Sequence, residues 1–275
     1  MRRIIQEKII LKDYLKTLDI SKAMIKRIKN HGDFLVNGQH VTVRYLLQKD
    51  DVLNIIFPLE LSCIEPDDIP LKIVYEDEYY LVIDKQANIP CIPTKRYPHH
   101  TLANGLIKYF NDHHILATVH LVNRLDKETQ GLMLIAKDSR SHYLLSQDIK
   151  QVKRVYHCLV EGTLKGEGII DSPIAKAHDS IKRIISKDGK EARTYYRVLK
   201  NIEDKTLVEC ILDTGRTHQI RVHLSSIGYP LAGDQLYGAK ENTLFYLDSV
   251  ELSFVHPYTK EFLEFKKEDK YDCKD

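Results

Sequence analysis

The N-terminal stretch alternates apolar and basic positions at helical spacing. Residues 9–29 place isoleucine, leucine and methionine side chains on one face and lysine and arginine side chains on the other, which is the pattern of amphipathic helices. Asp19 or Ser21 can cap a second helix, because either side chain can accept a hydrogen bond from a backbone N–H of the first turn. The sequence therefore predicts two short helices with basic outer faces.

A hairpin is predicted after these helices. Asn37-Gly38 separates the apolar run 34–36 from the next apolar positions, and Asn-Gly between such runs is a strong signal for a tight turn. A further run, residues 52–57, completes a compact unit. Its basic helices suit contact with phosphates, and a lysine-rich face that only meets solvent is the alternative interpretation.

Residues 58–70 differ in composition from both sides of the chain. They contain three prolines and several acidic residues, which is typical of a linker. We therefore expect three parts: a small module at 1–57, a linker at 58–70 and a larger domain at 71–275.

The larger domain mixes strand and helix patterns, which predicts an α+β fold. Short apolar runs bounded by turn residues indicate buried strands, and apolar positions at helical spacing indicate helices. The predicted strands are 71–75, 80–83, 117–122, 132–136, 153–160, 195–199 and 206–212, and the predicted helices are 101–111, 141–150 and 217–227.

A polar loop between two of these runs is the first candidate for chemistry. Residues 123–131 place Asp126 between Arg124 and Lys127, and we expect this carboxylate to stay ionised because opposite charge favours the charged form. An oriented carboxylate can serve as a nucleophile, a base or a metal ligand. The alternative is that Asp126 only caps a turn.

A second candidate lies at the start of the predicted helix after residue 215. Thr217 is a reasonable N-cap, Gly228 would end the helix, and Arg221 lies one turn into it. A forked, permanently charged side chain there can pair with a carboxylate or a phosphate, although a solvated arginine is the commoner case. His218 and His223 are five residues apart and do not share a helix face, so no metal site is predicted.

Composition and charge narrow the class of protein. The chain has 275 residues, 43% hydrophobic and 29% charged, with a formal net charge of +2, which is ordinary for a globular protein and too balanced to reveal a polyanionic partner. Its five cysteines are scattered, so we expect reduced thiols. The longest apolar runs are short and the first residues carry charge, so we expect neither a membrane span nor a signal peptide, and a cytoplasmic location.

Taken together, several segments resemble one family. Residues 123–132 resemble the H-R-L-D-x-x-T-S-G-L motif of the RluA family of pseudouridine synthases, and residues 214–224 resemble a second signature of that family. Lys153-x-x-Tyr156 and the segments 233–238 and 254–257 agree further, so the resemblance covers about residues 70–266. Residues 28–55 resemble an S4-type RNA-binding module. Two departures are Asn123 for the usual His and Gln130 for the usual Ser.

The resemblance implies a fold and a reaction. The fold would be a bent, mainly antiparallel sheet, and the reaction would isomerise uridine in ribosomal or transfer RNA to pseudouridine with no cofactor and no metal. Asp126 would be the essential carboxylate, attacking the sugar or the base or removing a sugar proton. Arg221 would pair with it, or Arg216 in its place. Tyr156 would stack on the uracil and help to remove the C5 proton.

Further roles follow from the same resemblance. Arg124 would fill the space that the everted base leaves in the RNA, Ile220 would form an apolar wall, and Thr129 would contact the substrate. The basic segment 176–193 would line the RNA path, and the enzyme is expected to be a monomer. The alternatives are a non-catalytic RNA chaperone or ribosome-assembly factor, which the two departures favour, and a small-molecule hydrolase with an Asp nucleophile.

Overall fold

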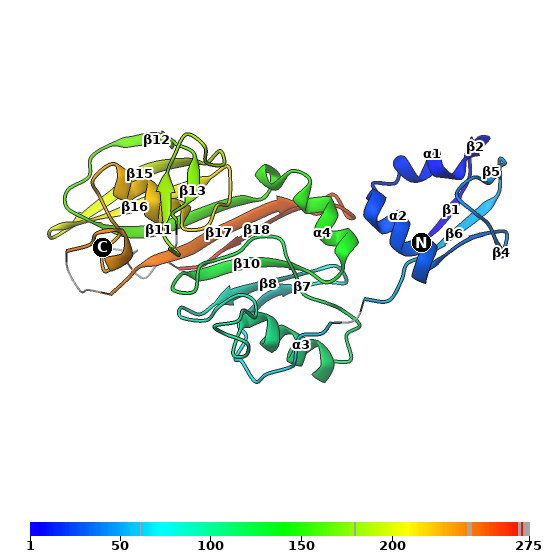
Figure 1. The fold of residues 1–275 in the computed structure, drawn as a ribbon, viewed down its shortest axis with the longest axis horizontal. Helices are drawn as coiled ribbons and strands as arrows, with labels where there is room; N and C mark the ends of the chain where they lie inside the picture. The colour runs from blue at the N-terminus through cyan, green and yellow to red at the C-terminus, as the bar shows by residue number, and fades with distance from the viewer. Residues whose placement is uncertain (61, 179, 241–243, 269–270, 272–275) are drawn as a thin grey trace.

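The N-terminal part of the chain forms a small body with its own core (Figure 1). The computed structural model describes residues 1–275 except 61, 179, 241–243, 269–270 and 272–275. The elements of this body are β1 (Arg2–Ile4), β2 (Ile9–Ile10), α1 (Leu11–Lys16), α2 (Lys22–His31), β3 (Asp33–Val36), β4 (Gln39–His40), β5 (Leu46–Leu47) and β6 (Val52–Ile56).

Local signals explain most of this body. Ser21 Oγ accepts a hydrogen bond from the backbone N–H of Met24 at 3.0 Å, which starts α2. Asn37 and Gly38 have φ angles of 52° and 85°, as a type I′ turn between β3 and β4 requires. The predicted helix at 9–10 is wrong, because these residues pair with β5 as a strand. The sheet order β1-β6-β3-β4 includes a strand, β1, that sequence patterning did not indicate.

The larger body is built around one long sheet. Its elements are β7 (Ile73–Glu76), β8 (Tyr80–Lys85), α3 (Leu102–Asp112), β9 (His120–Leu121), β10 (Gln130–Ala136), α4 (Ser139–Ser146), the 3₁₀ turn η1 (Ile149–Gln151), β11 (Lys153–Glu161), β12 (Glu167–Asp171), β13 (Ile174–Lys176), β14 (Arg183–Ile185), β15 (Arg193–Ile202), β16 (Lys205–Leu212), α5 (Gln219–Ser226), the 3₁₀ turn η2 (Gln235–Tyr237), β17 (Leu247–Val255) and β18 (Phe262–Lys266).

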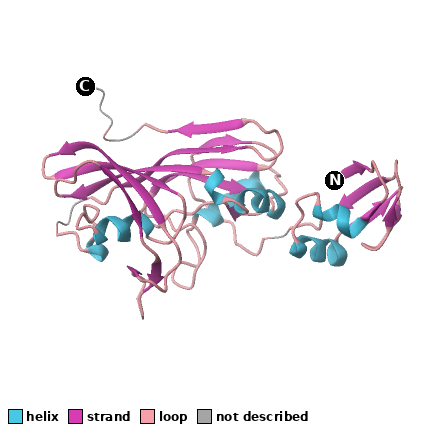
Figure 2. Cartoon of the chain, turned by 90° about the horizontal axis from the view of Figure 1, so that it is seen from above, coloured by secondary structure: helices cyan, strands magenta, loops and turns pink. Residues whose placement is uncertain are grey.

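The strand order confirms the α+β prediction of a mainly antiparallel sheet. The order is β12-β15-β16-β11-β17-β10-β8-β7, with β18 beside β17 and β9 beside β10. Of these pairs, β10 and β17 run parallel and the others antiparallel. Figure 2 shows the strong twist of this sheet, whose strands change direction from one end to the other.

Both faces of the central strands are covered, which explains their unbroken apolar runs. Along β10, Met133 and Ile135 face a core shared with α3 and α5. Leu132 and Leu134 face the other core, to which α4 contributes Leu145. The polar loop before β10 is therefore anchored on a strand that is fixed from both sides.

Several predicted boundaries differ from the structure, and three of them show why. The predicted strand 117–122 is reduced to His120–Leu121. The helix predicted at 141–150 begins at Ser139 because Asp138 caps it, and it ends at Ser146. Thr217 is not the N-cap of α5. That position is His218, which has a left-handed backbone with φ 57° and makes no side-chain cap.

Candidate active site

The loop 123–129 is held by contacts at both of its ends. Asn123 Oδ1 accepts the backbone N–H of Leu134 in β10 at 2.8 Å. The N–H of Thr129 donates to the carbonyl of Asp126 at 3.2 Å, which closes a turn. The first departure from the family motif therefore has a structural use, because the amide of Asn123 ties the loop to the strand that follows it.

A buried lysine supports the same loop from β8. Lys85 is 2% exposed, and its Nζ donates to the carbonyls of Gln86, Ile89 and Lys127. Burial lowers the pKa of Lys85 to about 8, since the ammonium loses its hydration. Sequence reasoning missed this residue, because a lysine at a strand end looks like a solvated turn residue.

The second departure, Gln130, also has a partner. Its Nε2 donates to Oδ2 of buried Asp248 at 2.7 Å, where β10 and β17 run parallel. Next to it, Gly131 has φ 108°, and a Cβ there would lie 2.4 Å from the carbonyl oxygen of Ser249. Only glycine fits this close approach of two backbones, so the loop enters the sheet at a fixed position.

Asp126 lies in a pocket whose positive charge comes from α5. Its Oδ2 is 3.8 Å from Arg221 Nη1 and 4.0 Å from His218 Nε2. Burial raises the pKa of Asp126, while His218 and Arg221 oppose this shift. The expectation that Arg124 and Lys127 supply the compensating charge is wrong. Arg124 is exposed, and Lys127 Nζ lies over the ring of Tyr97 at 4.8 Å.

Arg221 makes its strongest contacts with another carboxylate. Its Nε and Nη2 donate to the two oxygens of Asp234 at 2.7 and 2.8 Å, and both side chains are buried. The remaining nitrogen, Nη1, is the one that faces Asp126 and lies 3.6 Å from Glu128. A forked pair of this kind fixes the plane of the guanidinium, so Asp234 aims Arg221 at the loop.

His218 connects the pocket to the neighbouring hairpin. Its Nδ1 lies 2.8 Å from the hydroxyl of Tyr237, which also accepts the backbone N–H of Arg183 in β14. Burial lowers the pKa of His218, so the imidazole is mainly neutral at pH 7. Residue spacing bears on this histidine only as a metal ligand and predicts no other role for it. Its left-handed backbone turns the side chain toward Asp126 instead.

Tyr156 forms the floor of the pocket. Burial raises the pKa of Tyr156, so the phenol is protonated at neutral pH. The basic residue beside it is Arg154, whose guanidinium donates to the carbonyls of Val152 and Leu212. Lys153 instead pairs with Glu251 at the surface. The basic partner of Tyr156 in this segment is therefore Arg154, which sequence reasoning did not single out.

The other predicted residues meet at the same place. Arg124, Thr129, Arg216 and Ile220 line the pocket with Asp126, Tyr156 and Arg221. Thr129 is 2% exposed and its hydroxyl has no hydrogen-bond partner within the described part of the chain. Arg216 Nε donates to the carbonyl of Glu191 at 2.9 Å, so Arg221 is the better placed partner for Asp126.

The pocket is smaller than a nucleobase. Its cavity is about 40 Å³, the space of about three water molecules. An everted uracil can therefore enter only if part of the lining moves aside. Arg124 is the exposed member of the lining on the loop itself, so it can move aside without disturbing the core.

A basic groove of about 420 Å³ continues from the pocket. Arg124 and Arg216 line both spaces. Beyond them the groove is lined by residues of the β13–β14 hairpin and of the turn that follows it: Lys176, Arg183, Asp188, Gly189 and Lys190. With the two shared arginines, the groove has six charged side chains, and five of them are positive while Asp188 is negative. This excess of positive charge suits a polyanion.

The described residues contain neither a metal-binding cluster nor a membrane-spanning helix. No group of three or more His, Cys, Asp or Glu side chains among them is arranged to hold a metal ion. No described helix is long and apolar enough to cross a bilayer.

Comparisons with known proteins identify the family. A family model described as RNA pseudouridylate synthase matches residues 79–226. The chain is 43% identical over 264 residues to the RNA pseudouridine synthase YjbO of Bacillus subtilis, covering 93% of both chains. It is 39% identical over 209 residues to ribosomal large subunit pseudouridine synthase D of Nitrosomonas europaea, covering 71% of this chain and 61% of that protein.

A solved structure shows the same fold. Human RNA pseudouridylate synthase domain containing 1 superposes with a TM-score of 0.60 at 23% identity, covering 76% of this chain and 86% of that one. With the pocket and the sequence matches, this leads to one conclusion: the chain belongs to the RluA family of RNA pseudouridine synthases, which isomerise uridine in RNA to pseudouridine.

Proposed function

We propose that Asp126 is the essential catalytic carboxylate of this enzyme, with Arg221 and Tyr156 as its partners. The observation that carries the proposal is that these three side chains, from a loop, a helix and a strand, line one pocket. Burial makes Asp126 more basic and more nucleophilic than an exposed carboxylate. All three come from one chain, which supports an enzyme that works as a monomer.

The isomerisation requires two bond changes and two proton transfers at this pocket. The bond between C1′ and N1 of the uridine breaks, a bond between C1′ and C5 forms, C5 loses its proton and N1 gains one. Asp126 can act by attack on the sugar, by attack on the base or by removing a sugar proton. Arg221 would keep the carboxylate aimed in each case. No redox change occurs, so this chemistry needs no electron carrier.

Tyr156 suits stacking better than proton removal. Its ring closes the apolar floor with Ile220 and Leu247, and base–aromatic stacking contributes about 1–3 kcal/mol. Because its pKa is raised by burial, the phenol is a weak base at neutral pH. The expectation that it helps to remove the C5 proton is therefore less favoured than its role as a platform.

The basic groove is proposed as the path of the RNA strand. Lys176, Arg183 and Lys190 lie along it, and Arg216 and Arg124 lie where it meets the pocket. Arg124 is exposed at the mouth, where it can fill the space left by an everted base. Thr129, with its unpartnered hydroxyl, can hydrogen-bond the base or the sugar once the pocket opens.

We further propose that residues 1–57 are an S4-like RNA-binding module, 58–70 its linker and 71–275 the catalytic domain. The separate core of the first body and the exposed lysines of α2 support this division. Relatives named as ribosomal large subunit pseudouridine synthases favour ribosomal RNA, in the cytoplasm, as the substrate over transfer RNA.

The test is release of tritium from RNA that carries [5-³H]uridine. Wild-type protein is expected to release tritium from large-subunit ribosomal RNA, and Asp126→Asn to release none. Asp112→Asn, which changes an exposed carboxylate at the end of α3 that lines neither the pocket nor the groove, serves as the matched control and should retain release. Release that persists in Asp126→Asn would refute the role of this residue. RNA binding without release by wild type would support a non-catalytic factor.

A further inference from the structure

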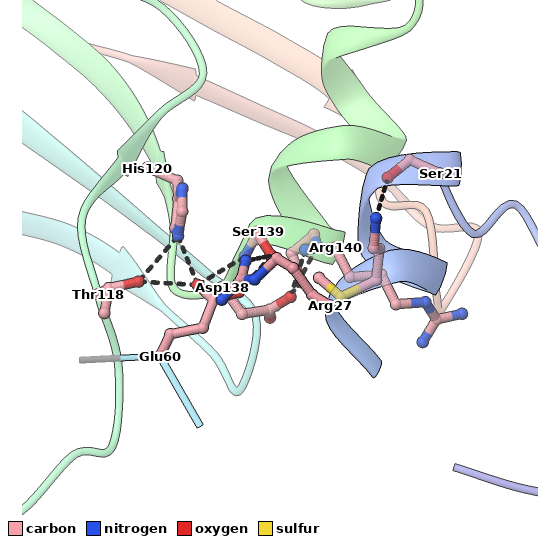
Figure 3. Close-up of polar contacts among 10 residues, drawn as sticks. Ser21, Arg27, Glu60, Thr118, His120, Asp138, Ser139 and Arg140 are labelled. Atoms are coloured by element: carbon pink, nitrogen blue, oxygen red, sulfur yellow. Dashed lines mark hydrogen bonds and ion pairs between the residues drawn. The ribbon is translucent and has the colours of Figure 1, made fainter. Parts of the chain in front are cut away.

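The short segment after β6 joins the two bodies through one partly buried carboxylate. Glu60 is 15% exposed at its side chain and lies between α2 of the N-terminal module and the start of α4 in the catalytic domain (Figure 3). From the module, Arg27 Nη1 donates to Glu60 Oε1 at 3.1 Å and to Ser139 Oγ at 3.3 Å. Arg27 therefore contacts both the linker and the catalytic domain.

The catalytic domain surrounds the same carboxylate with donors. The backbone N–H of Ser139 donates to Glu60 Oε2 at 3.2 Å, and the Ser139 hydroxyl donates to Oε1. Thr118 Oγ1 donates to Oε2 at 3.1 Å, and His120 Nε2 lies 2.7 Å from it. Ser139 is the first residue of α4, so Glu60 also meets the positive end of that helix.

These contacts keep Glu60 charged. Burial opposes ionisation, but hydrogen bonds from His120, Ser139 and Thr118 outweigh it and lower the pKa of Glu60 to about 2. The carboxylate is thus ionised throughout the physiological range. A linker residue without such partners would gain nothing from burial, because an unpaired buried charge is costly.

One more contact and a cavity lie at the same junction. The guanidinium of Arg140, also at the start of α4, lies 5.7 Å from the centre of the Phe57 ring, just after β6. A cavity of about 330 Å³ separates α2 from α4, lined by both helices. The bodies therefore meet through the polar contacts of Glu60 and the contact of Arg140 with Phe57, beside open space, which is the geometry of a latch rather than of a packed interface.

We propose that Glu60, with Arg27 and Ser139, is a latch that fixes the N-terminal module relative to the catalytic pocket, and so determines which uridines of a large RNA reach Asp126. The inference rests on the proposed function of the module and the pocket. Two RNA contacts held at a fixed separation bind one folded RNA more tightly than two contacts joined by a free linker. Glu60 is a positioning residue, because it touches neither site.

The first test is the shape of the free protein. Small-angle X-ray scattering should give one compact profile for wild type and a larger radius of gyration with a longer maximum dimension for Glu60→Ala. Glu65→Ala is the matched control, since Glu65 belongs to the same linker and its side chain is 74% exposed. Equal profiles for wild type and Glu60→Ala would overturn the latch, whatever the activity of the enzyme.

The second test compares two RNAs by tritium release. On large-subunit ribosomal RNA, Glu60→Ala should raise KM about tenfold and leave kcat within about twofold. On a short stem-loop cut from around the modified uridine, both constants should stay within about twofold. Loss of a negative charge can only strengthen nonspecific binding to RNA, so weaker binding reports lost positioning. Equal KM changes on both RNAs, or none on either, would overturn the latch.

A double-mutant cycle separates the latch from direct RNA contact by Arg27. If Arg27 acts through Glu60, the changes in KM on the large RNA should not add in Arg27→Ala/Glu60→Ala. Additive changes would assign Arg27 to the RNA instead and overturn its part in the latch. If wild type releases no tritium from either RNA, the proposed function fails, and the scattering comparison alone decides the latch.

Discussion

Replacing Asp234 by asparagine should both destabilise the catalytic domain and slow catalysis. Arg221 donates to both oxygens of Asp234 at 2.7 and 2.8 Å, and the two side chains are 6% and 1% exposed. Asparagine keeps one acceptor but turns an N–H₂ donor toward the guanidinium. Removing one partner of a buried pair costs about 3–5 kcal/mol.

Contacts that Arg221 can still make offset part of this loss in the free energy of unfolding. Arg221 Nη1 already lies 3.8 Å from Asp126 and 3.6 Å from Glu128, so the guanidinium can move toward them. We therefore expect a net loss of about 3 kcal/mol, which lowers the melting temperature of a domain of this size by about 6–12 °C. The shift of Arg221 also misaims Asp126, for which we expect a fall in kcat of about 100-fold.

The control uses the same type of pair at the surface. Arg193 Nε donates to Asp171 Oδ2 at 3.0 Å, but these side chains are 45% and 54% exposed. Asp171→Asn should cost at most about 1 kcal/mol, because solvent screens the pair. Scanning calorimetry and tritium release measure both variants. Equal destabilisation by Asp234→Asn and Asp171→Asn, or unchanged kcat in Asp234→Asn, would refute the reasoning from burial.

Three further predictions concern the loop and the RNA path. Burial lowers the pKa of Lys85 to about 8 in the folded protein, whereas a lysine in the unfolded chain has a pKa of about 10.4. Between these pH values the unfolded state binds more protons, so the free energy of unfolding should rise by about 3 kcal/mol as the pH increases. Urea unfolding of Lys85→Met should lack this rise, and a rise that persists would contradict the assignment. Asp126→Asn should have a higher melting temperature than wild type, because burial raises the pKa of Asp126 and its negative charge therefore destabilises the folded state at neutral pH. A melting temperature below that of wild type would show that the charge is not destabilising. Lys190→Ala should weaken RNA binding and reduce the slope of log affinity against log salt by about one unit, and an unchanged slope would remove Lys190 from the path.

Local patterns in the sequence predicted much of the secondary structure. The Asn37-Gly38 turn and the cap at Ser21 depend on a few neighbouring residues, so their signals survive without tertiary contacts. Predicted helix and strand ends were wrong where residues distant in the sequence decide them. At the start of α5, for example, His218 with its left-handed backbone takes the N-cap position that was predicted for Thr217.

The sequence by itself determined the family and the residues that would gather at the pocket, because its two signatures carry specific side chains in a fixed order. Only the tertiary structure decided how those residues are charged and held. Arg221 is aimed by Asp234, and Lys85 supports the loop from β8. The physical reason is that electrostatic partners and burial depend on which strands and helices lie side by side, and chain order does not specify this.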